Sequence, residues 1–77
     1  MIKTWILFFD ENGHNHAGSE WTHGIRLTAR NAIKRVYSPD YVKPHGAAGF
    51  MVLSHDEFML LDYEQIEKLY ILRSHEL

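Results

Sequence analysis

The sequence predicts a single small α+β domain over residues 1–77, with an antiparallel sheet of four to five strands and one principal helix. The expected order is β-β-α-β-β, followed by a short helical turn and a C-terminal strand. Three observations predict this class: an apolar run near the start of the chain, one segment with helical spacing near its middle, and two short apolar runs separated by polar turn residues. A chain of 77 residues can bury only a modest core.

The first apolar run, Ile2–Phe9, predicts a strand that is apolar on both faces. Side chains alternate between the two faces of a strand, so Ile6 and Phe8 share one face while Leu7 and Phe9 share the other. Such a strand is typical of the centre of a sheet. We expect it to be covered on both sides, or by the helix on one side and by a partner on the other.

A hairpin and a second strand follow this run. Asp10–Gly13 predicts a tight turn, because Asn12-Gly13 favours the positive φ values that a reversal needs. His14–Ser19 is polar and small, and we expect it to be an extended hairpin loop. Alternation resumes from Glu20 to Leu27 and predicts the returning strand.

The segment Gly24–Pro39 predicts the principal helix. Thr28 is expected to cap its first turn, and Ser38-Pro39 is expected to end it, because a residue before proline is disfavoured in the helical region. The residues at helical spacing that should face the core are Ala29, Ala32, Ile33 and Val36.

The C-terminal half begins with the loop Asp40–Gly49, which is rich in proline and glycine. Phe50–Leu53 and Phe58–Leu61 predict two strands joined by a hairpin turn at residues 54–57. The remaining segment has two interpretations. We favour a helical turn over Tyr63–Glu67 and then a strand over Lys68–Arg73, because residues 69–72 are apolar at every position; a continuous helix is the alternative.

Composition excludes several classes of protein. The absence of cysteine excludes a disulfide framework and a thiolate metal site. The apolar run near the N-terminus is too short to be a membrane span or a signal-peptide core, so we expect a cytoplasmic protein with no membrane partner. The net charge of −2 is unevenly distributed: from Arg26 to Lys43 five basic side chains stand against one acidic one, leaving −6 for the other residues. This split is typical either of an electrostatic docking face or of an ordinary solvated helix beside an acidic sheet.

No motif predicts catalysis or a cofactor. His14, His16 and His23 are the candidate metal ligands, because residues two apart in an extended segment point the same way. No recognised ligand spacing accompanies them, so no metal site is expected. Ser54-His55-Asp56 has the residue types of a catalytic triad, but neighbours in one turn cannot converge as a triad requires. We expect neither an enzyme nor a bound cofactor.

The basic side of the principal helix is the candidate binding surface. Arg30 and Lys34 are four residues apart and share one side of the helix. We expect this surface to bind a protein or a ribonucleoprotein complex. The alternative is nucleic acid, with the same side chains on phosphates; a pI near 6.3 stands against it. A homodimer is also possible. The partner-binding residues that we expect are Arg26, Arg30, Lys34, Arg35, Tyr37 and Lys43.

At the level of architecture and size, the chain resembles the small proteins that phages encode to block host machinery, such as anti-CRISPR proteins and inhibitors of host RNA polymerase. The segments that carry the resemblance are Ile25–Arg35, a strand leading into a helix, and Gly49–Leu61, the expected hairpin. The resemblance implies a non-enzymatic inhibitor that docks on a larger complex in the host cytoplasm. It assigns no role to any single residue.

Overall fold

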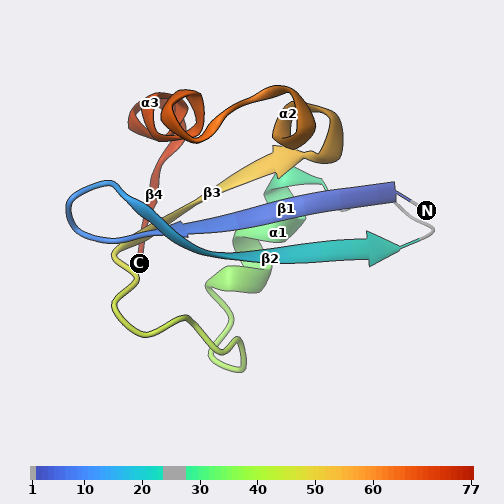
Figure 1. Ribbon diagram of the computed structural model, residues 1–77. Coiled ribbons are helices and arrows are strands. Elements are labelled where there is room, and N and C mark those ends of the chain that lie inside the picture. Colours follow the sequence, from blue (N-terminus) through green and yellow to red (C-terminus); the bar gives the residue numbers. More distant parts are fainter. Residues whose placement is uncertain (1, 24–27) are drawn as a thin grey trace.

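The computed structural model describes residues 2–23 and 28–77, with side chains described for residues 3–15 and 28–77. An antiparallel sheet with the strand order β2-β1-β3-β4 separates α1 on one face from α2 and α3 on the other (Figure 1). Three strands have six to nine residues and β4 has only two. The elements are β1 (Ile2–Phe9), β2 (Asn15–His23), α1 (Ala29–Val36), β3 (Gly49–Ser54), α2 (His55–Leu60), α3 (Tyr63–Arg73) and β4 (His75–Glu76).

Strand β1 lies between β2 and β3 and is buried on both faces, as its sequence predicts. Ile6 and Phe8 pack with α1 in one apolar cluster. Leu7 and Phe9 pack with Ile66 of α3 in a second cluster. Because helices cover both faces, β1 needs no partner protein to bury its apolar side chains.

The β1–β2 hairpin is tighter than expected. Asp10 Oδ1 accepts hydrogen bonds from the backbone N–H groups of Asn12 (2.9 Å) and His14 (3.0 Å), and Gly13 takes the positive φ of 79° that the reversal requires. Strand β2 begins directly afterwards at Asn15, so most of the expected loop His14–Ser19 is strand. The last part of the expected strand, residues 24–27, lies outside the described residues.

Helix α1 confirms the predicted cap and most of the predicted core face: Ile33 is half-buried against the core, whereas Ala29 is exposed. Thr28 Oγ1 accepts the N–H of Asn31 at 3.2 Å, which satisfies one of the donors left open by the first turn. Ala32 and Val36 are fully buried against the sheet. The helix ends at Val36, close to the predicted Ser38-Pro39 stop.

The expected second hairpin is wrong, because Ser54 begins a helix. Ser54 Oγ accepts the N–H of Glu57 at 3.2 Å, and Glu57 Oε1 accepts the N–H of Ser54 at 3.2 Å. This reciprocal capping box opens α2 where Phe58–Leu61 was expected to form a strand.

The expected strand Lys68–Arg73 is also wrong, because α3 runs continuously from Tyr63 to Arg73. A second capping box starts it: Asp62 Oδ1 accepts the N–H of Gln65 at 2.8 Å, and Gln65 Oε1 accepts the N–H of Asp62 at 2.9 Å. The sheet therefore has three full strands and the two-residue β4 in place of four to five full strands, because the segments expected to form the last two strands are helices. Across residues 2–23 and 28–77, no helix is long and apolar enough to cross a membrane.

Candidate functional site

The candidate site is the outward side of α1. Arg30, Lys34 and Arg35 are exposed there, and we call these three residues the basic side of α1. The opposite side of the helix is fixed on the sheet by Ala32 and Val36. The helix contains no acidic residue, so its positive charges are not neutralised within the element.

The structure gathers only part of the predicted site on this surface. Lys43 is exposed but lies in the loop after the helix, and Arg26 is outside the described residues. The Tyr37 hydroxyl donates to the backbone C=O of Glu76 at 2.6 Å, and its ring meets Phe50 edge-on with centroids 5.5 Å apart. Tyr37 therefore ties the end of α1 to β4, and half of its surface remains exposed.

Arg35 borders a hollow at the end of α1. Ser38, Asp40 and Tyr41 line this hollow of about 220 Å³ with it. The Tyr41 ring packs in a tilted orientation against the buried ring of Phe8, with the ring centroids 6.2 Å apart. The basic side of α1 thus ends beside an aromatic ring that the core holds in place.

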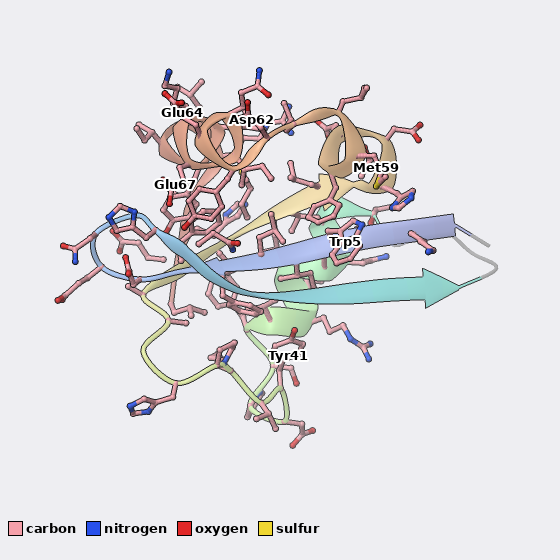
Figure 2. All side chains as sticks on the ribbon, viewed as in Figure 1. Trp5, Tyr41, Met59, Asp62, Glu64 and Glu67 are labelled. Atoms are coloured by element: carbon pink, nitrogen blue, oxygen red, sulfur yellow. The ribbon has the colours of Figure 1, made fainter. Side chains whose placement is uncertain are left out.

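The opposite face of the molecule is acidic, and it carries carboxylates of α2 and α3 that belong to the excess of negative charge outside residues 26–43. Figure 2 shows Asp62, Glu64 and Glu67 on the α3 side of the sheet. Between residues 54 and 77, Lys68 and Arg73 are the only lysine and arginine residues. The sheet therefore separates a basic layer from an acidic one. The carboxylates of the segment that runs from α2 to α3 are Asp56, Glu57, Asp62, Glu64 and Glu67.

Two of these carboxylates hold the acidic layer together. Glu57 Oε2 accepts from Arg73 at 2.8 Å, which joins the first turn of α2 to the last turn of α3. Burial acts to raise the pKa of Glu57, but the hydrogen bond and charge of Arg73 and the N–H of Ser54 hold it below the ordinary value of 4.5.

Glu67 connects α3 to the β1–β2 hairpin. Its Oε2 lies 3.0 Å from His14 Nδ1 and accepts the backbone N–H of Asn15 at 3.3 Å. Desolvation acts to raise the pKa of Glu67, but the hydrogen bonds from His14, Tyr63 and Asn15 hold it below 4.5. His14 is therefore engaged with a carboxylate of α3.

The structure does not assemble a metal site from the described side chains. No group of three or more histidine, aspartate or glutamate residues within that part of the chain could hold a metal ion. The side chains of the other two candidate ligands, His16 and His23, lie outside it.

The residues of the apparent triad make separate contacts. Ser54 Oγ bonds with Glu57, and His55 Nδ1 accepts the indole N–H of Trp5 at 3.0 Å. Ser54 is a helix cap, so its role is to start α2.

Comparison with known proteins gives no match: no family model covers the chain, and no curated protein or solved structure is significantly similar to it.

Proposed function

We propose that the protein is a non-enzymatic binding module that docks on a larger protein or ribonucleoprotein complex through the basic side of α1. One observation carries the proposal: three exposed cations gather on a helix without a carboxylate, while the carboxylates of α2 and α3 lie across the sheet. In this proposal the module acts as an inhibitor of the kind that phages direct against host machinery.

The chemistry of this surface favours an acidic partner. Complementary charge accelerates encounter and suppresses wrong partners, because juxtaposed like charges are repelled. Arginine also forms bidentate contacts with carboxylates and phosphates and is common among residues that dominate binding energy. Arg30 and Arg35 supply two such groups, and Arg35 lines a hollow with the aromatic ring of Tyr41. The acidic layer on the other face would orient the module with α1 toward the partner.

A pull-down with matched charge reversals tests the proposal. Lys34→Glu lies on α1 and Lys68→Glu lies on α3; both replace an exposed lysine on a helix and change the net charge equally. We expect Lys34→Glu, and more strongly the double variant Arg30→Glu/Lys34→Glu, to lose a partner that the tagged wild type captures from its native host. Lys68→Glu should retain the partner. Equal retention by all variants would remove α1 from the docking surface.

A nucleic-acid regulator is the second candidate, because Arg30 and Lys34 are placed to contact neighbouring phosphates. The two candidates differ in their response to nuclease and salt. If nuclease treatment releases the captured material, and if retention on a polyanion column falls steeply with salt, the partner is nucleic acid. A protein partner that remains after nuclease treatment supports docking on protein. The acidic layer opposite α1 favours the protein partner, since it repels a nucleic acid that bends around the module.

A further inference from the structure

Strand β2 lies at one edge of the sheet. Eight of its nine residues pair with β1 on one side, with a shift of register at His16, and across the described residues no strand pairs with its other side (Figure 1). An edge of this kind presents a row of backbone donors and acceptors that another strand can use.

The hydrogen-bonding pattern identifies which residues of β2 present these groups. The N–H of Leu77 donates to the C=O of Ala48 at 3.1 Å, and β4 pairs Phe50 with His75 in the same register. Bonded pairs alternate along an antiparallel ladder, so Phe50 directs its backbone groups toward β4 and away from β1. Its neighbour on β1, Phe8, must then direct its own groups toward β2.

Two side-chain bonds agree with this assignment. The Asn15 amide donates to the C=O of Phe8 at 3.0 Å, which places that carbonyl on the β2 side. The N–H of Ser54 donates to Glu57 and is therefore directed away from β1, as the alternation requires.

The same alternation applies to β2. Ser19 is opposite Ile6 and bonds with β1, whereas Gly18, Glu20 and Thr22 direct their N–H and C=O groups outward. Natural sheets protect such edges with proline, lysine or very short strands. Strand β2 is long and contains neither proline nor lysine, and its one shift of register lies at its first residues, Asn15–Ala17, so the pairing from Ala17 to His23 is regular.

We propose that the outer edge of β2 is a dimer interface, on which β2 of a second copy pairs antiparallel with Ser19 opposite Ser19. This register overlaps all nine residues of β2. It sets Gly18 opposite Glu20 of the second copy and Thr22 opposite His16 of the second copy. A register centred on Glu20 would set two carboxylates directly opposite each other, which is destabilising. The register centred on Ser19 avoids this repulsion, because Glu20 then lies opposite Gly18, and a second copy is the occupant that we infer.

The two-fold axis of this pairing is perpendicular to the sheet, so the two sheets become continuous. Both copies of α1 then lie on one face and both copies of α2 and α3 on the other. The dimer would double each charged layer. The interface does not depend on the proposed function, since it uses none of the residues on the basic side of α1.

Single cysteines test the register, because the natural chain has no cysteine. The two Ser19 residues would face each other across the interface without hydrogen-bonding to each other, because the backbone groups of each bond to β1 of its own copy. The Cα atoms of such a pair lie about 4.5 Å apart, within the range of a disulfide. We expect Ser19→Cys to form a covalent dimer with oxidised glutathione. Thr22→Cys is the matched control. Thr22 lies opposite His16 of the second copy, so the two cysteines of this variant would be six residues apart along the strands, or about 20 Å, and should not crosslink. Crosslinking of Thr22→Cys alone, or of neither variant, would overturn the proposed interface.

A proline at an outward position tests the same edge without a crosslink. Glu20→Pro removes an N–H that β1 does not use, and proline is tolerated at the free side of an edge strand. We expect the wild type and Glu20→Thr to dimerise with rising concentration in sedimentation equilibrium, and Glu20→Pro to remain monomeric with an unchanged circular dichroism spectrum. A monomeric wild type at every concentration, or a dimeric Glu20→Pro, would overturn the proposal. If Glu20→Pro unfolds, the cysteine pair decides. Arg30→Glu/Lys34→Glu should remain dimeric, so failure of docking and failure of dimerisation are distinguishable.

Discussion

At the scale of the residue, Trp5 shows how one side chain joins the sheet to the helix that covers it. Its ring stacks on Phe58 of α2 with centroids 4.0 Å apart, and its indole N–H donates to His55 Nδ1 at 3.0 Å. An indole can only donate, so His55 must offer a lone pair on Nδ1. The contact therefore requires that His55 is not protonated at that nitrogen.

Replacing the acceptor should break this hydrogen bond. His55→Phe keeps a ring beside Trp5 but has no nitrogen lone pair to accept the indole N–H. In a Trp21→Phe background, which leaves Trp5 as the only tryptophan of the chain, we expect His55→Phe to change the fluorescence emission of Trp5. Asp56→Ala, at the neighbouring exposed position, should leave the emission unchanged. Identical emission from His55→Phe and its parent would show that the hydrogen bond does not influence Trp5.

At the scale of the element, two capping boxes determine the C-terminal half of the fold. The pattern Ser54-x-x-Glu57 and the similar pattern Asp62-x-x-Gln65 each satisfy two backbone donors at a helix start. Each pattern is visible in the sequence. The alternating and continuous apolar residues predicted strands instead, because periodicity alone cannot distinguish short strands from short helices.

Removing one cap should measurably weaken the protein. Ser54→Ala deletes the oxygen that accepts the N–H of Glu57, and we expect it to lower the free energy of unfolding by about 1 kcal/mol. Urea denaturation followed by circular dichroism measures this loss. Ser54→Thr keeps the hydroxyl and should stay close to the wild type, as should Asp56→Ala on the exposed part of α2. If Ser54→Ala were as stable as Ser54→Thr, the cap would not stabilise α2.

The ion pair between Glu57 and Arg73 makes stability depend on pH. The pKa of Glu57 is lower in the folded chain than its ordinary 4.5, so the unfolded chain binds the proton more tightly. The contribution of Glu57 to stability is thus complete above about pH 4.5 and is lost as the pH falls through the folded pKa.

The variant Glu57→Gln isolates this dependence, because glutamine at this position preserves the capping box and removes the charge. We expect its melting temperature to lie below that of the wild type at about pH 6 and to converge with it as the pH falls through the lowered pKa of Glu57. Arg73→Gln, which breaks the same pair from the other side, should show the same convergence. A constant difference between wild type and Glu57→Gln across this range would contradict the linkage.

At the scale of the whole molecule, the sequence predicts the basic layer and the negative charge of the other residues, but not the face on which the acidic residues lie. Helical spacing places Ala32 and Val36 inward and Arg30 and Lys34 outward, so the exposure of this side follows from local pattern alone. The acidic layer depends on α2 and α3 both lying on the other face of the sheet, which requires tertiary packing against Leu7 and Phe9. The outward edge of β2 likewise depends on strand order and register, and these arise from pairing between distant segments.

The separation of charge should be measurable on the intact protein. The chain has a net charge of −2 and a pI near 6.3, so a uniform distribution of charge would send it through a cation exchanger at pH 7. Because a resin contacts one face at a time, we expect the wild type to be retained at low salt through the basic side of α1. Lys34→Glu should elute at markedly lower salt than Lys68→Glu, although each substitution lowers the net charge equally, from −2 to −4. Equal elution of the two variants would mean that net charge controls retention, and that the sheet does not divide the molecule into two electrostatic faces.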